Sequence, residues 1–282
     1  MRVPLALPFR QVAAAVTTSP RLLGVLAEAG RFARRLEAPL LLIHAGSPEA
    51  QKEAAFRDAL LTVGLSRATR LAWQAGEPAE AIATAAETEG VDLVIAGVLD
   101  RQAAANATYV GAVARTLAER ARCSVLLLSQ PQAEPKPFRR IVVMTDFSDC
   151  AKAALRQALW LAQADGAERV EVIALYTAFM QARAEHEPAG RTRQETERRL
   201  VEFVADSPAC GVALDVDIIE GTTGFGAYDF TQSVGADLLV VPAPPQLDGA
   251  VPPRMNWALQ VIPCSLWVVR ETIGQASPSG LS

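Results

Sequence analysis

The same order of sequence motifs occurs twice along this chain of 282 residues, and this repetition limits the folds open to it. In the first half, Val91-Asp-Leu-Val-Ile-Ala-Gly97 matches Ala236-Asp-Leu-Leu-Val-Val-Pro242 of the second half. Further on, Cys123-Ser-Val-Leu-Leu-Leu128 matches Cys264-Ser-Leu-Trp-Val-Val269. An internal repeat of this kind predicts two copies of one domain, in agreement with the length of the chain.

A polar, proline-punctuated segment, Gln130–Phe138, separates the two copies and is typical of a linker. We therefore predict domains at residues 1–130 and 140–272, a linker at 131–139 and a disordered tail at 273–282. The number of residues between a position in the first copy and its match in the second is larger in the middle of the repeat than at its start. The second copy therefore contains an insertion, which we place in the charged stretch Gln181–Val204.

Short, continuously apolar strands alternate with helical segments in each copy, which indicates a parallel sheet covered on both faces. Right-handed crossovers then give a doubly wound α/β fold with a ligand crevice at the carboxyl ends of the strands. Ser19, before Pro20, and Ser148 are the expected N-caps of the first helix in each copy. The expected strands are Val12–Val16, Leu40–His44, Leu93–Gly97, Val125–Leu128, Ile141–Thr145, Val170–Tyr176, Leu238–Val241 and Leu266–Val269, with weaker edge strands near Arg70–Gln74 and Val212–Ile219.

Charge and composition argue against several classes of partner. The net charge is −4 and the sequence pI is about 5.4, so neither nucleic acid nor an anionic membrane is an expected partner. No apolar run approaches the roughly 18 residues of a membrane-spanning helix, and the first residues do not resemble a secretory signal. The four cysteines are far apart, so we expect reduced thiols and a cytoplasmic protein.

Three stretches resemble the universal stress protein family. The best is Gln74-Ala-Gly-Glu-Pro-Ala-Glu-Ala-Ile82 followed by Glu89–Gly97; the others are the Cys-Ser openings of the last strands and Arg140-Ile-Val-Val-Met-Thr-Asp-Phe-Ser148. The resemblance implies two tandem doubly wound five-stranded parallel-sheet domains, each with the strand order 3-2-1-4-5. It also implies an intramolecular pseudo-dimer in which Ser124–Leu128 meets Ser265–Val269.

One branch of that family binds ATP, through a Gly-x2-Gly-x9-Gly-(Ser/Thr) loop after the fourth strand and an Asp at the end of the first strand. Glycines let backbone N–H groups approach phosphate oxygens, and the following helix start favours anions. In the first copy Gly97 matches the first glycine, but Asp100 replaces the second. Gly111 stands one residue late, Ala112 replaces the hydroxyl residue, and Thr17 replaces the Asp.

The second copy retains a different part of the pattern. It keeps Asp146 and Ser148, but its loop, Val241–Pro253, contains five prolines, which remove N–H donors, and Asp248 adds a negative charge. Each copy is therefore expected to carry a degenerate nucleotide site. These departures from the family's ATP-binding pattern predict no bound cofactor, with ATP in the first copy as the alternative.

Other conspicuous residues favour structural roles. Cys123 and Cys264 each precede an apolar strand and are expected to be buried thiols. His44 and His186 are far apart and form no zinc-site spacing. The pattern Gly221-Thr-Thr-Gly-Phe-Gly226 stands where the third helix of the second copy should begin.

Three functional hypotheses follow. The first is a non-enzymatic stress-response or regulatory protein with degenerate nucleotide sites, and the second is an ATP-regulated switch with nucleotide in the first copy. The third is an adenylating enzyme, which requires a Ser-Gly-Gly-x-Asp-Ser type loop where this chain has Thr17-Thr-Ser-Pro20 and Asp146-Phe-Ser-Asp149. The sequence names neither a stress nor a partner, and it leaves open whether two chains form a homodimer.

Overall fold

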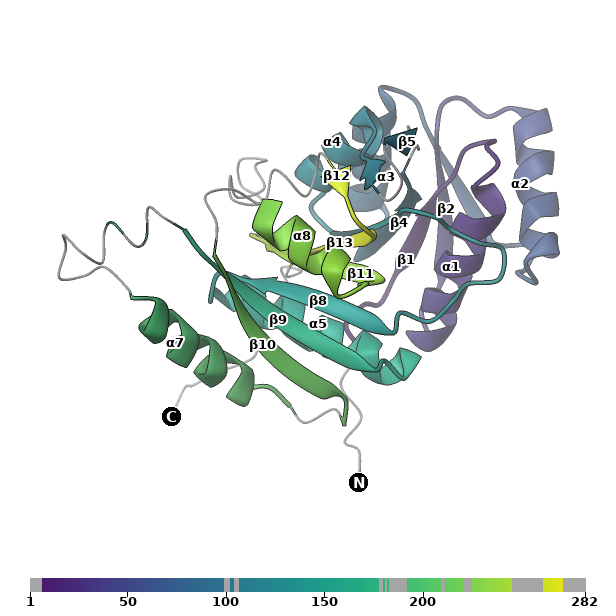
Figure 1. Ribbon diagram of the computed structural model, residues 1–282. Helices are drawn as coiled ribbons and strands as arrows, with labels where there is room; N and C mark the ends of the chain where they lie inside the picture. Colours follow the sequence, from purple (N-terminus) through teal and green to yellow (C-terminus); the bar gives the residue numbers. More distant parts are fainter. Residues whose placement is uncertain are drawn as a thin grey trace, which may run out of the picture.

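One ten-stranded sheet runs through both copies in the computed structural model of the chain (Figure 1). The structure describes residues 7–98, 102–103, 107–177, 180, 182, 192–208, 211–220, 225–244 and 261–270. The strands of the first copy are β1 (Val12–Ala15), β2 (Leu40–Ala45), β3 (Arg70–Gln74), β4 (Leu93–Gly97) and β7 (Ser124–Leu128). Those of the second copy are β8 (Arg140–Thr145), β9 (Arg169–Tyr176), β10 (Ala213–Glu220), β11 (Leu238–Ala243) and β13 (Ser265–Arg270).

The strand order across the sheet is β10-β9-β8-β11-β13-β7-β4-β1-β2-β3. Within each copy the neighbouring strands are parallel, and numbering them along the chain gives the order 3-2-1-4-5 in both. This confirms the predicted fold class. The two weaker strands, β3 and β10, form the outer edges of the sheet, as their alternating sequences predicted.

Helices cover both faces of the sheet, because each crossover places its helix on one side or the other. Buried side chains of α1, α2, α5 and α7 belong to one apolar cluster, and those of α3, α4 and α8 belong to another. The two faces therefore have separate cores, each continuous across both copies. The helices are α1 (Leu22–Arg35), α2 (Ala50–Thr62), α3 (Pro78–Thr88), α4 (Ala112–Arg120), α5 (Asp149–Asp165), α7 (Arg193–Ala205) and α8 (Phe225–Ser233).

The starts of the first helices differ between the copies. Ser148 is the N-cap of α5, and its Oγ accepts a hydrogen bond from the N–H of Ala151 at 3.2 Å, which confirms its predicted role. The same prediction for Ser19 is wrong. The Leu22 N–H binds the main-chain oxygen of Ser19 at 3.1 Å, so a turn precedes the helix and Arg21 becomes the N-cap, without a side-chain cap bond.

The insertion of the second copy lies before its second helix. In the first copy β2 ends at Ala45 and α2 begins at Ala50, whereas β9 ends at Tyr176 and α7 begins only at Arg193. The helix α7 is thus the counterpart of α2, and the predicted range of the insertion, which extended to Val204, was too long. Residues 183–191 lie outside the described part of the chain.

The last strands of the two copies join the halves. β7 and β13 pair antiparallel, with Leu127 opposite Leu266, Leu126 opposite Trp267 and Val125 opposite Val268. At one end of this pair the Ser124 Oγ donates to the main-chain oxygen of Arg270 at 3.2 Å and accepts from the Arg270 N–H at 3.0 Å.

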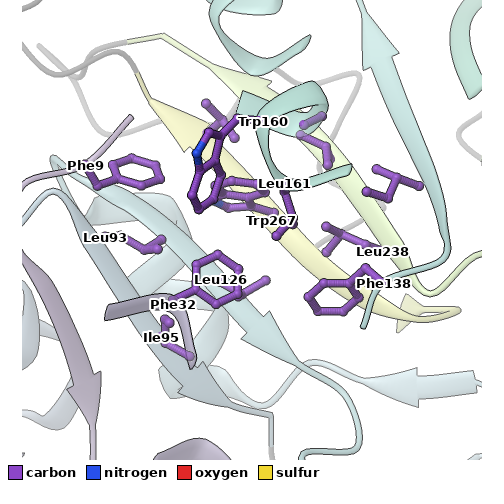
Figure 2. Packing of buried hydrophobic residues seen from close by; sticks show 14 of the residues in the cluster. Phe9, Phe32, Leu93, Ile95, Leu126, Phe138, Trp160, Leu161, Leu238 and Trp267 are labelled. Atoms are coloured by element: carbon purple, nitrogen blue, oxygen red, sulfur yellow. The ribbon is translucent and has the colours of Figure 1, made fainter. Parts of the chain in front are cut away.

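An aromatic cluster buries the region where the copies meet. Trp267 is 0% exposed, and its ring centroid lies 5.9 Å from that of Phe9 and 6.1 Å from that of Phe32. Trp160 of the second copy packs on Phe32 at 6.4 Å. Figure 2 shows these side chains gathered in one core, so neither copy completes its apolar core alone.

Buried charged side chains of the first copy also pair with an acidic side chain of the second copy. Nη1 of Arg31 on α1 lies 2.7 and 2.8 Å from the two carboxylate oxygens of Asp165 on α5, and Arg35 also pairs with this carboxylate. Asp165 further accepts the N–H of Phe138 at 2.6 Å, and Glu28 pairs with Arg31. Removing one member of such a cluster leaves a buried charge uncompensated, which costs about 3–5 kcal/mol.

Replacing Trp267 by alanine tests how far the two copies depend on each other. We expect Trp267→Ala to lower the free energy of unfolding by about 3–5 kcal/mol, because it leaves a cavity in the core that the two copies share. Leu61→Ala, at a side chain that is 52% exposed on α2, is the control and should change it by less than about 0.5 kcal/mol. Denaturant unfolding followed by circular dichroism measures both. An effect as small as that of the control would contradict a shared core.

Candidate ligand site

A cavity of about 280 Å³ opens at the carboxyl ends of β1 and β4 in the first copy. This is the position at which the strand order of a doubly wound sheet reverses and adjacent crossovers diverge, leaving a crevice. Most of the wall is apolar. It is lined by Ala15, Val16, Thr17, Ser19, Arg21, Leu22, Val25, His44, Ala45, Pro78, Ile82, Ala96, Gly97, Val98, Gly111, Val113, Ala114 and Leu117.

The structure brings three of the predicted site residues together in this cavity. Thr17 follows β1, Gly97 ends β4, and Gly111 is the N-cap of α4, and all three line the wall. Ala112 begins α4 beside Gly111 but is not among the lining residues. Asp100 lies outside the described residues.

Gly97 also has a packing role. A Cβ atom at this position would lie 3.1 Å from Cγ2 of Val25 on α1 and within 4 Å of the Arg21 side chain. Glycine thus lets α1 approach the end of β4 closely. Because this packing favours glycine with or without a bound phosphate, the residue alone does not identify a nucleotide site.

His44 reaches the cavity although its sequence position indicated only a structural role. It is buried near the end of β2, and its Nδ1 lies 2.8 Å from the main-chain oxygen of Val16. A carbonyl oxygen can only accept, so Nδ1 carries the hydrogen of this bond. The ring also packs against Phe56 and edge-on against Trp73. The expected strand order could have revealed this second role. It places β2 beside β1, so a residue near the end of β2 lies close to the crevice at the end of β1.

The remaining predicted residues, Asp146 and Ser148, belong to the second copy and lie at the corresponding end of β8. There, Oδ1 of Asp146 accepts hydrogen bonds from the Ser148 N–H at 3.0 Å and from the Ser148 Oγ at 2.5 Å. Phe147, between them, has a φ of 66° and donates its N–H to Thr145 Oγ1 at 2.9 Å. These polar groups therefore stabilise their own turn and the start of α5. The proline-rich loop that follows β11 lies outside the described residues from 245 onwards.

The described residues of the segment after β4, where a phosphate-binding loop would stand, include two short strands. β5 (Gln102–Ala103) and β6 (Ala107–Tyr109) pair antiparallel, and β6 pairs in turn with β12 (Val261–Ile262) of the second copy. The backbone of the second copy therefore holds the connection that leads from β4 to α4.

Arg270, at the end of β13, secures the other end of α4. Its Nη2 donates to the main-chain oxygens of Ala118 at 2.6 Å and Glu119 at 3.4 Å, in the last turn of the helix. These carbonyls lack partners within the helix, and a cation is favourable at this end of the helix dipole. Burial lowers the pKa of Arg270 to about 10, so the guanidinium stays charged at neutral pH.

Comparison with known proteins identifies the family. The model of the universal stress protein family matches residues 8–129 and again residues 137–270, so the chain belongs to that family, with two tandem domains. No curated protein matched the chain.

Solved structures share the fold over nearly the whole length. A functionally unknown protein from Pseudomonas aeruginosa PAO1 superposes with a TM-score of 0.69 at 19% identity, covering 94% of this chain and 93% of its own. A universal stress protein from Archaeoglobus fulgidus gives 0.63 at 14% identity, covering 92% of this chain and 98% of its own. At these identities the likeness establishes the fold alone.

The buried thiols provide a pH-dependent test. Burial raises the pKa of Cys123 to about 12 and also raises the pKa of Cys264. Because the thiolate is the reactive species, we expect neither to react with iodoacetamide in the folded protein at pH 8, and their reaction to begin only towards pH 12 or on unfolding. Mass spectrometry of labelled peptides measures this. Cys150, which is partly exposed in the first turn of α5, is the control and should be labelled at pH 8.

Proposed function

We propose that this chain is a non-enzymatic stress-response or regulatory protein that binds a small ligand in its first copy. In this proposal the second copy is a structural partner with a degenerate site. The observation that carries it is the asymmetry of the two strand-end sites. The first copy has a cavity with a mostly apolar wall. At the matching position of the second copy, the Asp146 carboxylate accepts hydrogen bonds from the N–H and the hydroxyl of Ser148.

The chemistry of the cavity supports a binding role rather than catalysis. Its polar lining residues are Thr17, Ser19, Arg21 and His44, with no carboxylate among the described residues of the wall. The Nδ1 of His44 is engaged by the Val16 carbonyl, a group that cannot become charged to assist proton transfer. Within the described part of the chain, no group of three His, Cys, Asp or Glu residues is placed to hold a metal ion.

The ATP-regulated switch is the second candidate, and the placement of two glycines favours it. Gly97 and Gly111 both line the cavity, as they would in a nucleotide site. Against it stands Thr17, which lacks the carboxylate that accepts hydrogen bonds from a nucleoside. The β5–β6 pairing also uses backbone groups in the segment that would otherwise wrap the phosphates.

We further propose that the protein works in the cytoplasm, as a self-contained pseudo-dimer. Cys123 and Cys264 are buried free thiols, which suits a reducing compartment. None of the helices it describes is both long and apolar enough to cross a membrane. Since β7 and β13 already pair with each other, a second chain would need another surface to form a homodimer.

Millimolar ATP with Mg²⁺ tests the choice between the two candidates. We expect it to leave Tm unchanged in a thermal unfolding assay and to yield no ADP or AMP on incubation. A ligand at 100 times its Kd would stabilise the fold by about 2.7 kcal/mol, so real binding would be visible. A rise in Tm that Ala114→Phe abolishes, by filling the cavity, would favour the switch instead. Turnover of ATP would contradict the non-enzymatic role.

A further inference from the structure

His44 brings a hydrogen-bond acceptor to the cavity of the first copy. Its side chain lines the cavity, and the residue is only 6% exposed. Because Nδ1 donates to the Val16 carbonyl at 2.8 Å, Nε2 of the neutral ring carries a lone pair and no hydrogen. No described residue donates a hydrogen bond to Nε2. A buried acceptor without a donor costs free energy, which a ligand with a suitable donor would recover.

The neighbours of the ring leave Nε2 uncovered. Phe56 and Trp73 pack against the ring, with centroids 5.2 and 5.0 Å from its own, and neither is among the described residues that line the cavity. Gly46 lies beside Nε2 but has no side chain to cover it, since a Cβ atom there would stand 3.5 Å from Nε2. The surface that His44 gives to the cavity is therefore not the part that the two aromatic rings cover.

Few other described side chains of the wall can accept a hydrogen bond. Arg21 only donates, so the hydroxyl groups of Thr17 and Ser19 are the remaining side-chain acceptors. Thr17 is exposed and Ser19 is partly exposed, so water competes for both hydroxyl groups. His44 thus supplies the buried side-chain acceptor of the described wall.

The second copy has no counterpart of this acceptor. Ala15 of β1 and Met144 of β8 are equivalent, because each stands two residues before the matched strand-end residue. The β2 residue paired with Ala15 is followed by His44. The β9 residue paired with Met144 is followed by Ala174. Since alanine has no polar side-chain atom, the acceptor is a feature of the first copy and not of the fold.

The rest of the wall and the volume limit the body of the ligand. Val25, Ile82 and Leu117, from α1, α3 and α4, supply buried apolar surface. Such a wall favours a body that gains by leaving water. An apolar cavity of roughly 150 Å³ holds benzene, and this cavity has a volume of about 280 Å³. It therefore suits a molecule of about two fused rings.

Resting on the proposed ligand-binding role, we propose that this cavity takes a small apolar molecule, of the size of a two-ring aromatic, with one N–H or O–H group. The apolar body lies on Val25, Ile82 and Leu117, and the N–H or O–H group donates a hydrogen bond to Nε2 of His44. A molecule of the same shape without the donor leaves Nε2 unpaired, so the cavity selects against it.

Indole and benzofuran form a matched pair of probes, because they share two fused rings and differ at one atom. Indole has an N–H donor where benzofuran has an oxygen that can only accept. We expect isothermal titration calorimetry of the full chain at pH 8.5 to show that indole binds about three- to tenfold more tightly, as one hydrogen bond typically allows. This pH lies above the range of about pH 5 to 8 in which histidine ordinarily changes its charge.

Two substitutions of His44 assign the preference to Nε2. The amide nitrogen of asparagine can replace Nδ1 and donate to the Val16 carbonyl, but nothing then replaces Nε2. His44→Asn should therefore remove the preference for indole while benzofuran still binds. The longer glutamine side chain can bring its amide oxygen to the place of Nε2, so His44→Gln should retain a preference for indole.

Two further variants test the other acceptor and the cavity itself. Thr17→Val removes a competing hydroxyl group from the wall and should keep the preference for indole. Ala114→Phe should abolish binding of both probes by filling the cavity, and a circular dichroism spectrum like that of the wild type shows that it folds.

Other outcomes separate this inference from the proposed function. If both probes bind equally and Ala114→Phe abolishes both, the cavity is a ligand site but its preference for a donor is wrong. If neither probe binds, the inference is overturned, and a rise in Tm with ATP would overturn the preferred function as well. A preference that survives His44→Asn would refute the role of Nε2, and one that Thr17→Val removes would assign it to the hydroxyl group instead.

Discussion

The antiparallel pairing of β7 with β13 is the interaction on which the rest of the structure depends. A parallel five-stranded sheet that ended at its fifth strand would expose an apolar edge with unpaired N–H and C=O groups. Here each copy covers that edge of the other, and Trp267 fills the core beneath the junction. The Arg31–Asp165 pair, which joins α1 of the first copy to α5 of the second, is buried as well.

This junction also explains how the two copies could diverge. Once the second copy is fixed beside the first, it contributes β12 to the pairing with β6, and Arg270 to the end of α4. Both contacts act on elements that frame the cavity of the first copy. The second copy therefore supports that cavity without a binding site of its own. Its Asp146 and Ser148 side chains stabilise the turn at the end of β8.

Periodicity and repetition predicted most of the fold, because apolar strands and helix starts leave local signals. The ten strands lie within a few residues of their expected positions, and the N-cap Ser148 was correctly placed. The Ser19 cap failed because a main-chain turn before α1 competes with a side-chain cap for the same N–H group. The two-residue strands β5 and β12 are too short to give a periodic signal.

The site was less accessible to sequence reasoning. Motif positions located Thr17, Gly97 and Gly111 on its wall, since these follow strands whose ends converge. The apolar character of the cavity and the place of Arg21 and His44 in it depend on side-chain packing between distant elements. The pairing of Arg31 with Asp165, 134 residues apart, likewise has no sequence signature.

Native-state amide hydrogen exchange of β7 and β13 tests most directly whether the two copies form a single cooperative sheet. Amides of both strands should exchange only through global unfolding, with the same opening free energy as the flanking strands β4 and β11 and with the same dependence on denaturant. Exchange of β7 and β13 through a separate opening of markedly lower free energy, while β4 and β11 stay protected, would contradict the account.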